Sequence, residues 1–91
     1  MTVVEMDEAT GEMTKTVLGA NVLNDEHVQH TVKAGIWFGS YPNEGTPFSF
    51  VGCTVAPGFE FDDFELASRK KLLSAFPKYK GVIEKLTVGL P

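Results

Sequence analysis

The chain of 91 residues is short enough to form a single domain, and a domain of this size buries only about 60–65% of its unfolded surface. Its formal net charge of −4 argues against a nucleic-acid partner, because nucleic-acid-binding proteins present a basic surface. A single cysteine, Cys53, excludes an internal disulfide framework, and no apolar run approaches the ~20 residues of a membrane span. The acidic N-terminus lacks the features of a signal peptide, so we predict a cytoplasmic protein with no membrane partner.

The beginning of the chain predicts a β-hairpin. Residues 2–6 contain two valines and are predicted to form a strand, followed by an acidic turn over residues 7–12 that includes Gly11. Residues 13–18 are rich in Thr and Val, which is typical of a returning strand. Residues 19–26 are predicted to be a loop, because Gly, Asn and Asp supply turn chemistry there.

Three more strands are predicted in the middle of the chain. Residues 27–32 and 36–41 are two of them, separated by a tight turn at Ala34-Gly35. A polar hairpin loop over residues 42–47 leads to the longest predicted strand, residues 48–55. Neither face of that strand is strongly polar, so we expect it to be covered on both sides.

The end of the chain predicts two short helices. Ser68 is a suitable N-cap for the first helix, Pro77 ends it, and residues 78–86 form the second. The apolar residues expected to face inward are Leu72, Leu73, Phe76, Val82, Ile83 and Leu86. The predicted fold class is therefore mainly β, an antiparallel sheet with two short C-terminal helices.

Four motifs of the chain are similar to the small-cupin branch of the cupin superfamily, which is catalogued as a domain of unknown function. Residues 16–19 resemble its T-V-L-G, and residues 29–37 its Q-x-x-V-P-x-G-x-W. Residues 52–59 match G-C-x-V-A-P-G-F, and residues 61–66 match F-x-D-F-E-L. The resemblance implies a cupin-type, jelly-roll-like sheet or partial barrel, with residues 1–66 as the β portion and residues 67–87 as a helical cover.

The chain departs from the family pattern at two places. Lys33 stands where the family has Pro, and no segment matches the family's early H-R-x-x-x-D-E-x-W-H-F motif. We therefore expect residues 1–91 to be a single cupin domain that lacks its N-terminal part. An incomplete sheet leaves unpaired strand edges, which favour association with another chain, and we predict a homodimer through the sheet edges.

No metal or other cofactor is predicted. Metal-binding cupins carry a His at the position that Phe38 occupies here, and the early His-rich motif is missing. His27 and His30 are three residues apart, so on a strand they would point to opposite faces and could not share a metal ion.

The predicted ligand-binding residues are Gln29, Thr31 and Trp37. Gln29 and Thr31 share one face of a predicted strand and offer an amide and a hydroxyl group. Trp37 offers a flat apolar wall with one N–H donor. The alternative is that Gln29 satisfies a neighbouring backbone group and that Trp37 packs in the core.

No catalytic residue is predicted. The sequence places no His near Cys53 that could activate its thiol, so we predict no nucleophilic role for it. We expect Cys53 to be a small core residue instead. In residues 59–66 we expect the aromatic side chains to anchor an extended strap while the acidic side chains face solvent. The lysines of the two helices are expected to form a solvated face, or to take part in charge pairs within the chain or at a dimer interface.

Three functions remain open from the sequence. The first is binding of a small sugar-like or carboxylate-like molecule in the barrel. The second, by analogy of fold alone, is a sugar-nucleotide epimerase or isomerase, which needs a general base such as a His held by a carboxylate. His30 has no orienting partner that the sequence reveals. The third is a non-catalytic dimerisation module.

Overall fold

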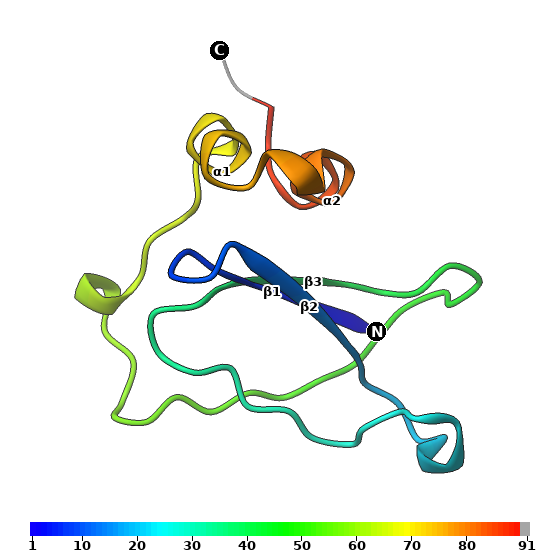
Figure 1. The fold of residues 1–91 in the computed structure, drawn as a ribbon. Helices are drawn as coiled ribbons and strands as arrows, with labels where there is room; N and C mark the ends of the chain where they lie inside the picture. Colours follow the sequence, from blue (N-terminus) through cyan, green and yellow to red (C-terminus); the bar gives the residue numbers. More distant parts are fainter. Residues whose placement is uncertain (90–91) are drawn as a thin grey trace.

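A computed structural model describes residues 1–89, which form a three-stranded antiparallel sheet with two short helices across one face (Figure 1). The strands are β1 (Thr2–Asp7), β2 (Glu12–Val17) and β3 (Trp37–Tyr41), arranged in the order β2-β1-β3. The helices are α1 (Arg69–Ala75) and α2 (Lys80–Leu86). Single 3-10 turns lie at Val22–Asn24, Phe61–Asp63 and Pro77–Tyr79.

The predicted hairpin is confirmed. β1 pairs with β2 from Thr2↔Val17 to Asp7↔Glu12, and the connecting turn places Gly11 at φ +73°, a conformation that glycine adopts without a steric penalty. β1 also pairs with β3, so it is the central strand. The apolar residues in the sequence of β1 suit a central strand, and Val3, Val4 and Met6 are all buried.

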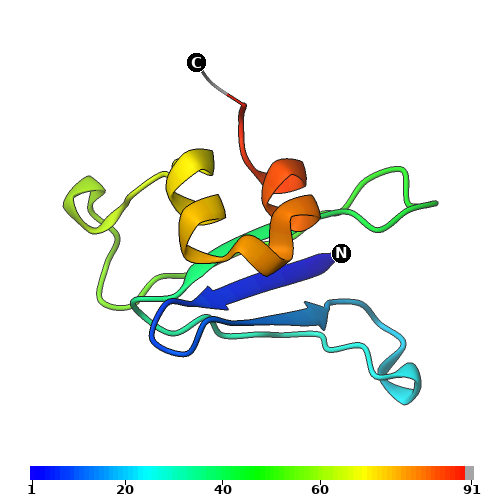
Figure 2. The ribbon, with the colours of Figure 1, turned by 45° about the horizontal axis from the view of Figure 1, so that its top comes forward.

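The core lies between the sheet and the helices (Figure 2). Alternation along β1 directs Val4 and Met6 toward the helices, where they join a buried cluster with Leu72, Phe76 and Ile83. The largest fully buried side chains are those of Phe76, Ile83 and Val4. Helix packing on one face of the sheet therefore supplies most of the buried apolar surface of the described residues.

The helix boundaries also agree with the sequence. The Ser68 hydroxyl accepts a hydrogen bond from the Lys71 backbone N–H, and Pro77 begins the 3-10 turn that follows α1. Arg69 ties the two helices together, because its guanidinium donates to the Thr87 hydroxyl at 2.8 Å and to the Glu84 carbonyl at 2.7 Å. These bonds satisfy acceptors at the C-terminal end of α2.

The predicted strand at residues 27–32 is wrong. Only a single bridge joins the segment to the sheet, between Leu18 and His27, and the rest is irregular. Gln29 instead donates a hydrogen bond to the Thr31 hydroxyl two residues away. Such local side-chain bonds compete with a strand when no neighbouring strand offers a ladder.

The predicted strand at residues 48–55 is also wrong, as is its coverage on both sides. The segment is irregular, and no backbone hydrogen bond within residues 1–89 involves it. Phe50 is 94% exposed, and Cys53, predicted to be a core residue, is exposed as well. A segment with strand-forming residues becomes a strand only when a neighbouring strand pairs with it. Among the described residues the sheet ends at β3, so residues 48–55 have no such partner.

The predicted strap at residues 59–66 is not anchored by its aromatic residues. Phe61 and Phe64 are 82% and 54% exposed, and with Phe59 they contact one another. Because residues 48–66 do not cover the sheet, residues 1–89 do not form a closed barrel. The predicted class is therefore supported as an antiparallel sheet with two helices.

Candidate functional site

The face of the sheet opposite the helices carries a carboxylate on its central strand. Glu5 lies between Thr14 of β2 and Phe38 of β3 in the strand register, and its side chain is only 16% exposed. Alternation along β1 places Glu5 on this face because its neighbours Val4 and Met6 face the helices. A poorly hydrated carboxylate at the centre of a sheet requires a polar partner.

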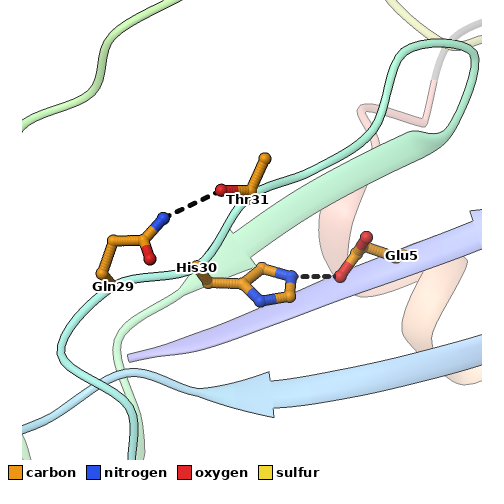
Figure 3. A network of polar contacts seen from close by, with 4 residues as sticks. All are labelled: Glu5, Gln29, His30 and Thr31. Carbon is orange, nitrogen blue, oxygen red and sulfur yellow. Dashed lines mark hydrogen bonds and ion pairs between the residues drawn. The ribbon is translucent and has the colours of Figure 1, made fainter.

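That partner is His30, which reaches Glu5 from the irregular segment between β2 and β3 (Figure 3). His30 Nε2 lies 2.5 Å from Glu5 Oε1, and the histidine side chain is 24% exposed. When Nε2 carries the proton, it donates to the carboxylate and leaves Nδ1 as a proton acceptor. The structure thus corrects the sequence-based view that His30 has no orienting partner.

An open depression of about 340 Å³ surrounds this pair. It contains three carboxylates and one ammonium group in addition to the imidazole, and three threonines supply hydroxyl groups. The lining residues are Glu5, Asp7, Thr10, Glu12, Thr14, His30, Thr31, Lys33 and Ile36. The depression is therefore polar, rich in hydrogen-bonding groups of both kinds, and negative in overall charge.

Two of the three predicted ligand-binding residues lie beside the depression. Thr31 lines it, and the Gln29 side-chain amide donates to the Thr31 hydroxyl at 2.9 Å (Figure 3). Both side chains are exposed. The bond orients the Thr31 hydroxyl and leaves the Gln29 carbonyl oxygen as an acceptor for another molecule.

The third predicted residue, Trp37, does not line this depression. It stands opposite Met6 in the strand register, so its side chain lies on the helix-covered side and packs against the core. Its indole N–H donates to Glu8 Oε1 at 2.6 Å. This packing agrees with one of the two alternatives for Trp37, and its role in ligand binding stays a prediction.

The histidines are also separated from each other. His27 lies 3.9 Å from the Asp25 carboxylate, whereas His30 contacts Glu5. No group of three His, Cys, Asp or Glu side chains in residues 1–89 is arranged to hold a metal ion. Among the same residues, no helix is long and apolar enough to cross a membrane.

Comparison with known proteins gives one match. Residues 1–67 match the family model described as Cupin superfamily (DUF985). No curated protein and no solved structure matches the chain. The matched span contains all three strands and both members of the Glu5–His30 pair, and it stops immediately before the Ser68 cap of α1.

Proposed function

Because the chain belongs to the Cupin superfamily (DUF985), we propose that it binds a small, neutral, sugar-like molecule in the depression around Glu5 and His30. The observation that carries this proposal is the 2.5 Å contact between His30 Nε2 and Glu5 Oε1. It fixes a donor–acceptor pair beside a depression whose volume is near the lower end for small-molecule sites.

The charge of the depression favours a neutral ligand over a carboxylate. Glu5, Asp7 and Glu12 would repel an anionic group, and only Lys33 and a protonated His30 would offset them. Sugar hydroxyls donate and accept hydrogen bonds, so they can pair with the carboxylates and with the hydroxyls of Thr14 and Thr31. A neutral polyhydroxylated molecule therefore suits this depression better than a carboxylate.

Isothermal titration calorimetry with matched neutral pyranoses and their uronic acids tests the proposal. We expect at least one neutral sugar to bind, and its uronic acid to bind at least about tenfold more weakly, a difference of about 1.4 kcal/mol. Equal or tighter binding of the uronic acid would contradict the ligand class. A panel in which no sugar produces heat or stabilises the fold would contradict binding itself.

A second candidate is an isomerase-type activity at the same site. The general base in such an enzyme is typically a His held by a carboxylate, and His30 with Glu5 has this arrangement. The Nδ1 atom would accept a proton from carbon in the substrate, and incorporation of solvent deuterium into a bound sugar would reveal that step. A sugar that binds and never exchanges its carbon-bound protons would limit the site to binding.

We also propose a homodimer through the sheet edges. The outer edge of β3 has no strand neighbour among residues 1–89, and residues 48–55 offer a strand-like sequence whose backbone is unpaired within that range. Unpaired edges of this kind associate with other chains through backbone hydrogen bonds. Such bonds depend little on ionic strength, which separates this association from a charge-driven one.

A further inference from the structure

One large apolar side chain is exposed on the sheet beside the proposed ligand site. Phe38 of β3 is 66% exposed, and within residues 1–89 it is the only exposed large apolar side chain that belongs to a strand. It lies directly opposite Glu5 in the register of β1 and β3. Side chains that oppose each other in an antiparallel pair share one face, with Cβ atoms about 4.5–5.5 Å apart. Phe38 therefore borders the carboxylate of the Glu5–His30 pair.

The neighbours of Phe38 along β3 show which side of the sheet it occupies. A Cβ atom added at Gly39 would lie 3.2 Å from a methyl group of Leu86 in α2, and Trp37 packs against the core. Both residues therefore face the helices, which lie on one side of the sheet (Figure 1). Alternation directs Phe38 to the opposite side, where Ile36, two residues earlier, lines the depression.

The depression continues toward Phe38. A larger, open hollow adjoins it, and four residues line both: His30, Thr31, Lys33 and Ile36. Phe38 lines the larger hollow. A molecule held at the polar pair therefore has the phenyl ring beside it.

The phenyl ring supplies a kind of surface that the depression itself offers little of. Among the described residues that line the depression, Ile36 alone is apolar. The axial C–H groups of a pyranose form an apolar patch of slight positive charge on each face of the ring. The face of a phenyl ring is apolar and carries the negative part of its quadrupole, so it attracts such a patch. Small-molecule sites typically combine aromatic walls of this kind with a few polar groups.

We propose that Phe38 is the stacking surface for the ring of a cyclic sugar held at the Glu5–His30 pair. This inference rests on the proposed function and narrows its ligand class. An open-chain polyol offers the same hydroxyl groups to the polar pair but has no rigid C–H face to place on the phenyl ring. Phe38 thus selects pyranoses over open-chain polyols, while the polar pair orients their hydroxyl groups.

Calorimetric titration with glucose, galactose, mannose and xylose, each beside the alditol obtained by reducing it, tests this selection. Wild-type protein is expected to bind its tightest pyranose at least about tenfold more tightly than the matching alditol. Phe38→Ala is expected to weaken pyranose binding at least about fivefold and to leave alditol binding unchanged, since only the cyclic sugar loses a contact. Phe38→Tyr keeps the ring and should bind the pyranose within about twofold of wild type.

Proton NMR of the bound sugar provides a second readout. The ring current of Phe38 should shift the axial C–H protons of the pyranose upfield in wild type and in Phe38→Tyr, and not in Phe38→Ala. Phe38→Leu keeps an apolar side chain without a flat ring, so it should behave as Phe38→Ala does. It supplies the same comparison if the alanine variant loses its fold, which far-UV circular dichroism checks.

Phe61→Ala is the matched control, because Phe61 is 82% exposed and lines neither hollow. We expect it to bind pyranoses as wild type does. Equal affinity of wild type for a pyranose and its alditol, or unchanged pyranose binding in both Phe38→Ala and Phe38→Leu, would overturn the stacking role and leave the proposed function intact. Failure of every sugar to bind wild type would overturn both.

Discussion

Phe76→Ala is expected to lower the free energy of unfolding by about 3–5 kcal/mol, the largest effect of any single substitution considered for this chain. Phe76 is 2% exposed and sits in the cluster that joins α1 to β1. Its removal leaves a cavity that the short helices cannot fill without moving. For a domain of this size the melting temperature should fall by about 12 °C or more. Urea and thermal unfolding followed by circular dichroism measure both quantities.

Phe50→Ala is the matched control, because it makes the same chemical change in a side chain that is 94% exposed. We expect its effect on unfolding to stay within about 0.5 kcal/mol. A loss at position 50 as large as that at position 76 would mean that residues 48–55 pack into the protein in solution. The sheet would then extend beyond β3, as the sequence alone predicts.

Glu5→Ala is expected to reduce the affinity for a neutral sugar by roughly tenfold or more, since hydrogen bonds to charged groups contribute about 1.5–3 kcal/mol. The substitution removes a ligand acceptor and also releases His30, whose position depends on the 2.5 Å contact. His30→Ala should weaken binding similarly. The loss from the double variant should be smaller than the sum of the two single losses, because the pair acts as a unit. Calorimetric titration of the four proteins supplies the measurement.

Glu8→Ala is the matched control for Glu5→Ala. Glu8 also accepts a hydrogen bond from a ring N–H, that of Trp37 at 2.6 Å, and it lies three positions along the chain from Glu5. We expect no change in sugar affinity in this variant, since Trp37 packs on the helix-covered side. If Glu8→Ala weakened binding as strongly as Glu5→Ala, the result would support the binding role predicted for Trp37, and the Glu5–His30 site would lose its basis.

The sequence predicts those parts of the fold that are stabilised by local chemistry or by an unambiguous apolar stripe. The hairpin of β1 and β2 follows from the turn at Gly11, and α1 follows from Ser68 and from the spacing of Leu72 and Phe76. The family resemblance, based mainly on residues 52–59, is confirmed by the match over residues 1–67. Family membership, however, does not specify which strands pair within this chain.

The predicted strands at residues 27–32 and 48–55 show the limit of this reasoning. Both have residue types that suit a sheet, but strand formation depends on a neighbour in the right place, which a single segment cannot indicate. In the described residues, His27 makes one bridge and residues 48–55 make none. The phenylalanines of residues 48–55 are exposed for the same reason, because no neighbouring strand draws this segment into the sheet.

The candidate site was only partly predictable. The binding roles of Thr31 and Gln29 are predictions from their residue types, whereas the Glu5–His30 pair joins residues 25 apart and depends on tertiary structure. One signal was available in the sequence. Glu5 interrupts the apolar stretch of β1, and an acidic residue in the middle of a central strand needs a partner on the same face. The chain offers two histidines, and only the structure distinguishes His30 from His27.

The most direct measurement of the central claim is chemical-shift mapping by NMR during titration with a neutral sugar. The predicted result is that the largest saturable changes occur in the amide signals of Glu5, Thr14, His30, Thr31 and Lys33, on the sheet face away from the helices. Signals of the helix-covered side, such as those of Trp37 and Leu72, should change little. Saturable changes centred on that side, or none at any sugar concentration, would contradict the claim that the Glu5–His30 depression is the ligand site.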